Sequence, residues 1–155
     1  MYLPPFAQAY LFYLAIVFFI TVVRIASDAV FFPWDYSLLG LATFTAFYVL
    51  SKSLTKSSSL KMVSLHLTAS IVLLALSWEY KYAGGEAVYS AISALVYDVI
   101  NTPGLYFAAN TAVWVPSGAS RFFVEMQVHL VHIGTTAALI FFFHGLARTV
   151  RRGSS

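Results

Sequence analysis

Long apolar runs, separated by short polar stretches, are the main feature of this sequence. The runs at 9–32, 37–51, 62–82 and 120–147 have the length and texture of membrane helices. About 20 apolar residues, rising 1.5 Å each, cover the roughly 30 Å of hydrocarbon in a bilayer. The second run is short, but its small residues allow close helix contact. We therefore predict an all-α integral membrane protein built as a bundle of four transmembrane helices.

The region 86–115 has a different pattern. Residues 86–100 have the residue pattern of a helix, and the sequence Asn-Thr-Pro-Gly at 101–104 predicts that this helix stops there. Residues 105–115 form a second apolar piece. Each piece is too short to cross a bilayer by itself. We expect a re-entrant hairpin or two interfacial helices rather than a fifth crossing.

The distribution of charge sets the orientation of these spans. The chain of 155 residues is 60% hydrophobic and 10% charged, which predicts a single membrane domain over 1–155. Six basic residues form one group that contains no acid: Lys52, Lys56, Lys61, Arg148, Arg151 and Arg152. The positive-inside rule then places both termini in the cytoplasm and the hairpin outside, in a cell membrane or an organellar inner membrane.

Composition also excludes several classes of function. The absence of cysteine removes disulfides, thiolate metal sites and thiol catalysis. We find no H-E-x-x-H, Walker loop or dinucleotide fingerprint, so any catalysis is expected within an oxidoreductase complex. The basic residues follow topology rather than forming a patch, which argues against nucleic acid. The expected partners are the lipid bilayer and other membrane subunits or further copies of this chain.

A polar stripe runs along the last predicted span. Arg121, Glu125, His129 and His132 are spaced at i, i+4, i+8 and i+11, which keeps them within a stripe about 80° wide. An ionisable group at the centre of a membrane costs about 2.5–3.5 kcal/mol on insertion scales, so such groups face protein, a cavity or a ligand. The stripe is therefore a candidate site.

Further ionisable residues are expected at a similar depth. Glu79 ends the third span, and Arg24 and Asp28 are i, i+4 partners in the first, where we predict a structural ion pair. With Glu125, His129 and His132, Glu79 is a candidate for a metal ion site, a proton relay or a quinone pocket. The alternative is that these charges only neutralise one another at a helix interface.

Two further histidines suggest a cofactor at the basic end. His66 lies five residues after Lys61, and His144 lies four residues before Arg148. At 1.5 Å per residue both are about 6–8 Å deep, on antiparallel helices. Two facing imidazoles in a helix bundle can bind a b-type haem axially. The alternative is that each is an interfacial histidine bonded to a carbonyl or a headgroup.

Three functions remain open from the sequence. The first is a small subunit of an energy-transducing, respiratory or redox membrane complex that binds haem b and handles quinone or protons. The second is a proton- or metal-coupled transporter or channel component. The third is a purely structural membrane subunit whose buried charges fix helix packing.

The haem hypothesis predicts a coloured protein. A reduced-minus-oxidised absorption spectrum of the detergent-purified chain should show six-coordinate b-type bands, and His66→Ala or His144→Ala should remove them. A colourless preparation would contradict the hypothesis, provided that haem extraction before purification shows that no haem was lost on the way.

Overall fold

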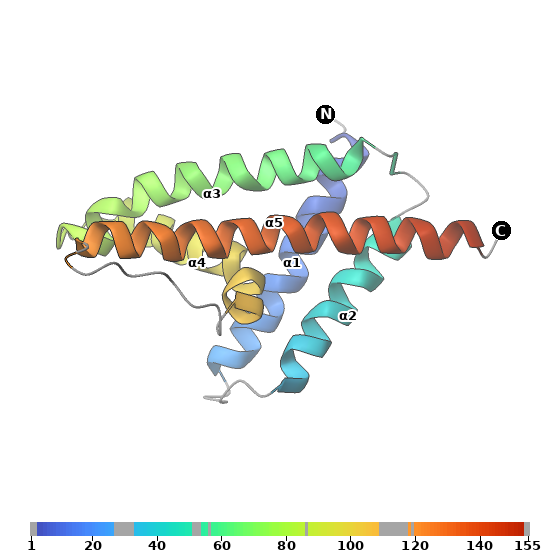
Figure 1. The fold of residues 1–155 in the computed structure, drawn as a ribbon, viewed down its shortest axis with the longest axis horizontal. Coiled ribbons are helices and arrows are strands. Elements are labelled where there is room, and N and C mark those ends of the chain that lie inside the picture. Colours follow the sequence, from blue (N-terminus) through green and yellow to red (C-terminus); the bar gives the residue numbers. More distant parts are fainter. Residues whose placement is uncertain are drawn as a thin grey trace.

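The computed structural model is all-helical over the residues that it describes (Figure 1). These are 3–26, 33–50, 54–55, 57–85, 87–108, 118 and 120–153, without the side chains of 24–26, 33–39, 50, 105–108 and 121. The order of elements is α1 (Pro5–Ala26), α2 (Pro33–Leu50), α3 (Ser58–Tyr82), α4 (Val88–Ala108) and α5 (Arg121–Gly153).

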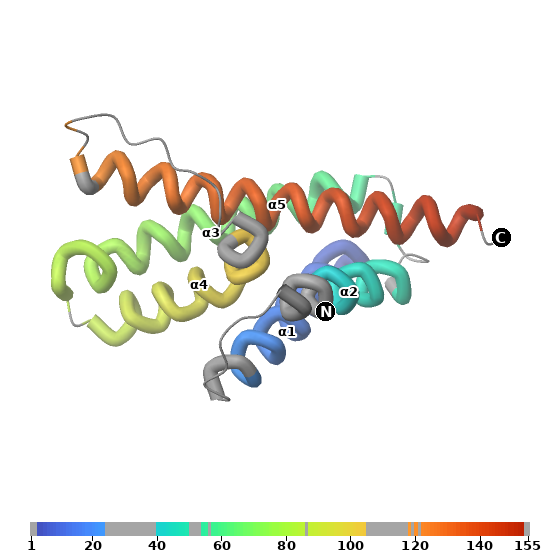
Figure 2. Tube along the Cα trace, turned by 60° about the horizontal axis from the view of Figure 1, so that its bottom comes forward, coloured from blue at the N-terminus to red at the C-terminus, as the bar shows by residue number. Residues whose placement is uncertain are grey.

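The two longest helices, α3 and α5, run antiparallel beside each other (Figure 1). Ser59 near the start of α3 contacts His144 of α5, and the rings of Trp78 and Phe122 meet at the other end with centroids 5.5 Å apart. Helix α4 lies along both of them, whereas α1 and α2 form an inclined pair (Figure 2). The bundle is therefore a three-helix layer crossed by a helical pair.

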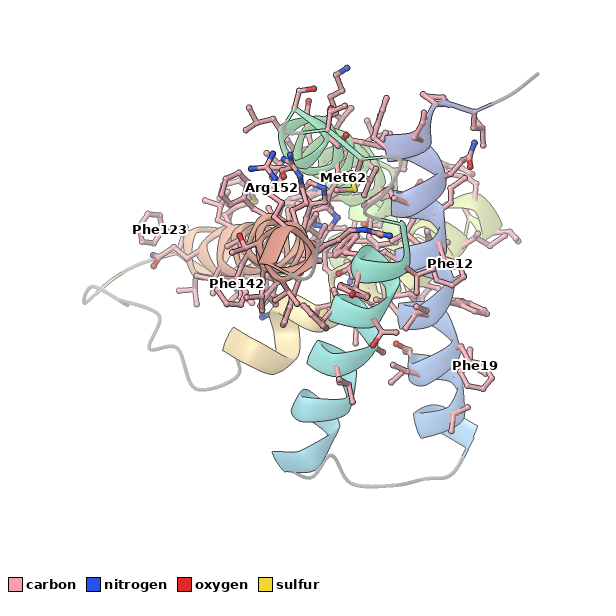
Figure 3. All side chains as sticks on the ribbon, turned by 90° about the vertical axis from the view of Figure 1, so that its right-hand side faces the viewer. Phe12, Phe19, Met62, Phe123, Phe142 and Arg152 are labelled. Carbon is pink, nitrogen blue, oxygen red and sulfur yellow. The ribbon has the colours of Figure 1, made fainter. Side chains whose placement is uncertain are left out.

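Large apolar side chains cover much of the outside. On α1, Phe12 is 48% exposed and lies in a groove shared with α2, and Phe19 is 68% exposed and points away from the other helices (Figure 3). Three helical segments are long and apolar enough to cross a membrane: Pro5–Val23, Ser58–Tyr82 and Phe122–Gly153. Exposed apolar helix faces of this length are what lipid requires, and water would disfavour them.

The larger of the two apolar clusters found among the described residues lies where the inclined pair meets the layer. Tyr13 of α1 stacks on Phe47 of α2, with ring centroids 5.7 Å apart, and both are fully buried. Met62 of α3 and Ile140 of α5 complete this cluster. The contact between the two helical units is therefore aromatic and well packed, which favours a fixed crossing geometry.

Helix α4 continues through the predicted stop at 101–104, which corrects that prediction. Pro103 lies inside the helix, where proline removes a hydrogen bond to the preceding turn. Thr136 of α5 binds the backbone on either side of Pro103: its hydroxyl accepts from the Gly104 amide at 2.7 Å and donates to the Asn101 carbonyl at 3.4 Å. A neighbouring helix thus supplies hydrogen bonds to the backbone next to the proline. Most of the predicted second piece, 105–115, lies outside the described residues.

Other helix limits differ from the predictions by a few residues. Helix α2 begins at Pro33, four residues before the predicted span 37–51, because proline is well suited to the first helical position. Helix α3 begins at Ser58, four residues before the predicted span 62–82, and α5 continues to Gly153, six residues beyond the predicted end at 147. After α3, Gly84 has a φ of 68°, in the left-handed region that glycine adopts readily.

Gly104 allows α4 to approach α5 closely, and Gly104→Ala tests this contact. A Cβ there would collide with the His132 carbonyl oxygen and the Thr136 hydroxyl. We expect the free energy of unfolding, measured by SDS titration in mixed micelles, to fall by about 1–3 kcal/mol.

The control is Gly134→Ala on α5, where a Cβ meets no atom within 4 Å. Because alanine is the better helix former, this variant should be as stable as the original chain or slightly more so. Equal losses in the two variants would show that the close approach at Gly104 is not needed.

Candidate functional site

The buried face of α3 is mostly polar. Ser59, His66, Ser70 and Ser77 repeat at i, i+7, i+11 and i+18, and all four are buried. This spacing keeps them on one side of the helix, toward α1, α4 and α5. Small polar residues at such an interface allow close packing and supply hydrogen bonds between helices.

Four buried side chains form the first hydrogen-bonded series, which we call the inner series. The Tyr10 hydroxyl of α1 bonds to His66 Nδ1 at 2.9 Å. His66 Nε2 lies 3.5 Å from the Ser70 hydroxyl, which accepts from the Asn101 side-chain amide of α4 at 3.2 Å. The inner series thus joins α1, α3 and α4, and uses both ring nitrogens of His66.

Three residues form the second series, the outer series, around His129 of α5. Its Nδ1 bonds to the Tyr97 hydroxyl of α4 at 2.9 Å, and its Nε2 bonds to the Tyr82 hydroxyl of α3. A neutral imidazole has one N–H, so one tyrosine donates to the ring and the other accepts from it. His129 therefore ties together three helices.

A small cavity lies between α4 and α5 beside both series. It has a volume of about 150 Å³ and is lined by Tyr97, Asp98, Asn101, Val128, His129 and His132. The Asn101 amide also donates to the Tyr97 carbonyl at 3.0 Å, which places the end of the inner series against the outer one. Its volume is large enough for a few water molecules, which the polar side chains in its wall could bind.

An ion pair stands at the edge of this cavity. Lys81 Nζ lies 2.7 Å from Asp98 Oδ1 and 5.3 Å from the centroid of the Tyr97 ring. The Asp98 side chain is 59% exposed although it also lines the cavity. Asp98 therefore links the buried polar groups to the outside of the bundle.

The structure brings together only part of the predicted polar cluster. His129 and His132 both line the cavity, and Glu125, which is half-buried, is among the charges that act on His129. Glu79 is exposed and accepts a hydrogen bond from Tyr89 at 2.9 Å. This bond and the negative charge of Glu79 raise the pKa of the Tyr89 phenol.

Some predicted residues cannot be placed in this site. The side chains of Arg24 and Arg121 and the whole of Asp28 lie outside the described residues, so the ion pair of Arg24 with Asp28 stays a prediction. Within the described part of the chain, no group of three or more His, Asp or Glu side chains is arranged to hold a metal ion.

His66 and His144 lie in different surroundings. His144 Nδ1 bonds to Ser59, seven residues before His66 on α3, so the two histidines are offset by about 10 Å along that helix. The matching depth predicted from the basic ends is wrong, because α3 begins before Lys61 and α5 continues beyond Arg148.

The two imidazoles differ in their remaining hydrogen-bonding capacity. Among the described residues His144 Nε2 is buried without a hydrogen-bond partner, and Phe47 packs edge-on against its ring. Both ring nitrogens of His66, however, have partners within α1 and α3. Haem binding stays a prediction, which the absorption spectrum of the purified chain tests.

Several residues of the site were not identified from the sequence. Tyr10 and Tyr82 were counted only as residues of the predicted spans 9–32 and 62–82, and Asn101 as part of the predicted stop at 101–104. The serine spacing on α3 is the signal that was available, because a polar stripe repeating at helical spacing within an apolar run marks a buried face. The tyrosine partners come from other helices and have no such signal.

Comparison with known proteins adds no relative to this description. No family model matches the chain, and neither a curated protein nor a solved structure matches it significantly. The fold and the site therefore define the class: an all-helical protein with three segments fit to span a membrane and a buried histidine–tyrosine network.

The variant Tyr97→Phe tests the outer series. It removes one hydroxyl and leaves His129 Nδ1 buried without that partner, which should lower the free energy of unfolding by about 1–3 kcal/mol. Tyr89→Phe, on the same helix, is the matched control because its hydroxyl bond to Glu79 is exposed and should cost less than about 0.5 kcal/mol. Similar losses in both would argue against a buried network.

Proposed function

We propose that this chain is a four-span membrane protein with both termini in the cytoplasm. Four helix ends gather at the basic end: the start of α1 and of α3, and the end of α2 and of α5. Lys61 lies over the ring of Phe6 at 5.6 Å, and Arg151 donates to the Tyr48 carbonyl at 3.2 Å. The positive-inside rule assigns this end to the cytoplasm.

The proposed re-entrant segment corresponds to α4. This helix begins just after α3 ends and reaches the level of Thr136 on α5. Helix α5 begins where α3 ends, as the contact of Trp78 with Phe122 shows. The chain therefore leaves the end of α3, enters along α4, and starts α5 at the same end, which supports a re-entrant path over a fifth crossing.

The function that the geometry supports best is proton handling, as a small subunit of an energy-transducing membrane complex. The observation that carries this proposal is the pair of histidines, His66 and His129, each hydrogen-bonded through both ring nitrogens to hydroxyl groups. An imidazole or hydroxyl can accept a proton on one side and release one on the other. Chains of such groups within membrane segments are typical of proton relays.

The cavity and Asn101 set the order of such a relay. A proton from the outside passes from Asp98 through water in the cavity to His129 and its tyrosines. Asn101 separates this water from Ser70 and His66. A carboxamide donates and accepts hydrogen bonds but does not exchange protons readily, so Asn101 slows proton transfer between the two series without preventing it.

The size of the cavity favours protons over quinone. Pockets for organic ligands usually have volumes of about 300–1,000 Å³, and this cavity has about 150 Å³.

An alternative function of a different class is a proton-coupled transporter, because the same relay would serve coupled transport. A structural subunit is the third, because the same hydrogen bonds also fix helix packing.

Proton flux into liposomes that contain the purified chain tests this proposal. With a pH-sensitive dye inside and a potassium diffusion potential, we expect flux above that of empty liposomes. His129→Gln or His66→Gln should reduce it about tenfold or more, because each variant interrupts one series. Asn101→Ala should increase it, since this slow step is removed.

Ser77→Ala is the matched control for these variants. Ser77 lies on the same buried face of α3 but donates only to the Leu74 carbonyl of its own helix. Its flux should equal that of the original chain. If the original chain and all of its folded variants give only the flux of empty liposomes, the structural subunit is favoured. Flux that requires a co-transported solute would favour the transporter.

A further inference from the structure

A shallow groove lies on the outside of the bundle, where the starts of α1 and α3 meet (Figure 1). Its volume of about 610 Å³ is within the range of about 300–1,000 Å³ that is usual for sites of organic ligands. None of its residues belongs to the inner or the outer series. Six residues line it: Phe6 of α1, and Leu60, Lys61, Ser64, Leu65 and Thr68 of α3.

Three of the lining residues are polar and follow one another along the outer face of α3. Lys61, Ser64 and Thr68 are spaced at i, i+3 and i+7, and all three are exposed. At 1.5 Å per residue, Ser64 lies about 4.5 Å and Thr68 about 10 Å beyond Lys61 along the helix. The groove therefore begins at a cation and continues past two hydroxyl groups into the membrane segment Ser58–Tyr82.

The two hydroxyl groups in the groove keep their hydrogen-bonding capacity. Among the residues that the structure describes, the side chains of Ser64 and Thr68 have no hydrogen-bond partner. Other hydroxyls donate to a carbonyl of their own helix, as those of Thr21, Ser77 and Thr149 do. A hydroxyl that faces hydrocarbon without a partner is unfavourable, so a ligand that accepts from these groups would stabilise this surface.

Lys61 gives the groove its positive charge. Its ammonium lies 5.6 Å from the centroid of the Phe6 ring, which holds the cation between α1 and α3. An ammonium has three N–H donors, so contact with one ring leaves donors for an oxygen anion. The acids whose side chains the structure describes lie on α4 or toward the other end of α3 and α5: Glu79, Asp98 and Glu125.

The rest of the groove is apolar. Leu60 and Leu65 are both exposed, and they lie beside the polar residues on the same helix. An acyl chain gains free energy by covering such side chains, whereas a small soluble anion gains nothing from them. A cation, a hydroxyl and an apolar wall, in this order, match the phosphate, the ester and the acyl chain of a phospholipid.

We propose that this groove binds one anionic phospholipid. Its phosphate oxygens accept from the Lys61 ammonium, an ester carbonyl accepts from the Ser64 hydroxyl, and one acyl chain lies along Leu65. Positive charge beside a membrane span attracts anionic lipids. The site requires neither the proton relay nor a particular orientation of the chain, so a failure of the flux measurement would leave it unaffected.

Lipid binding to the full chain in neutral detergent, measured by native mass spectrometry, tests the site. Phosphatidylglycerol should bind saturably and more tightly than phosphatidylcholine. Lys61→Gln should weaken phosphatidylglycerol binding about fivefold or more, whereas Lys61→Arg keeps the charge and should stay within about twofold. Leu65→Trp fills the groove without a change of charge and should also weaken binding about fivefold or more.

Each of these variants has a matched control. Arg148→Gln removes the same charge at the same end of the bundle, but Arg148 does not line the groove. Leu67→Trp adds the same bulk to an exposed position of α3 that does not line the groove either. Both controls should leave phosphatidylglycerol binding within about twofold of the original chain. The helical circular dichroism of each variant shows whether it is folded.

Three results would overturn the proposal. The first is phosphatidylcholine binding as tightly as phosphatidylglycerol. The second is a loss in either control that equals the loss in its partner variant, because binding would then reflect overall charge or bulk. The third is a dimer that Leu65→Trp removes and Leu67→Trp retains, which would assign the groove to a second copy of the chain.

Discussion

The cost of burying polar groups without partners is the constraint on which this structure depends. Inside a bilayer each unsatisfied polar group costs several kcal/mol, so the histidines, tyrosines and serines of the buried faces must meet one another. His66 and His129 meet this requirement through both ring nitrogens, with partners from α1, α3 and α4. These bonds determine which helices lie together and at what depth.

The same constraint explains the course of α4. Pro103 would end a helix in water, yet Thr136 satisfies the backbone groups on either side of it and Gly104 lets the two helices approach. The resulting contact holds Asn101 against Ser70 and next to the cavity. The geometry of the candidate site therefore follows from how a proline-containing helix is accommodated.

Sequence patterns predicted the elements better than their contacts. Apolar runs identified the helical class, and four of the five helices lie within a few residues of the predicted spans, because length and hydropathy are local properties. The stop at 101–104 was wrong because its outcome depends on Thr136, a residue of another helix. His129 and His132 were identified as site residues by their stripe, but the tyrosines that bind His129 come from distant positions and have no local signal.

A relay through the bundle requires that protons reach His66, which is fully buried. Solid-state ¹⁵N NMR of histidine-labelled protein in bilayers can follow the exchange of each ring N–H when the sample is transferred into D₂O. The account predicts that the ring N–H of His66, although fully buried, exchanges with solvent, and that Asn101→Ala makes this exchange faster. If His66 keeps its protium while His129 exchanges, and Asn101→Ala changes nothing, the two series are separate structural hydrogen bonds and the relay does not exist.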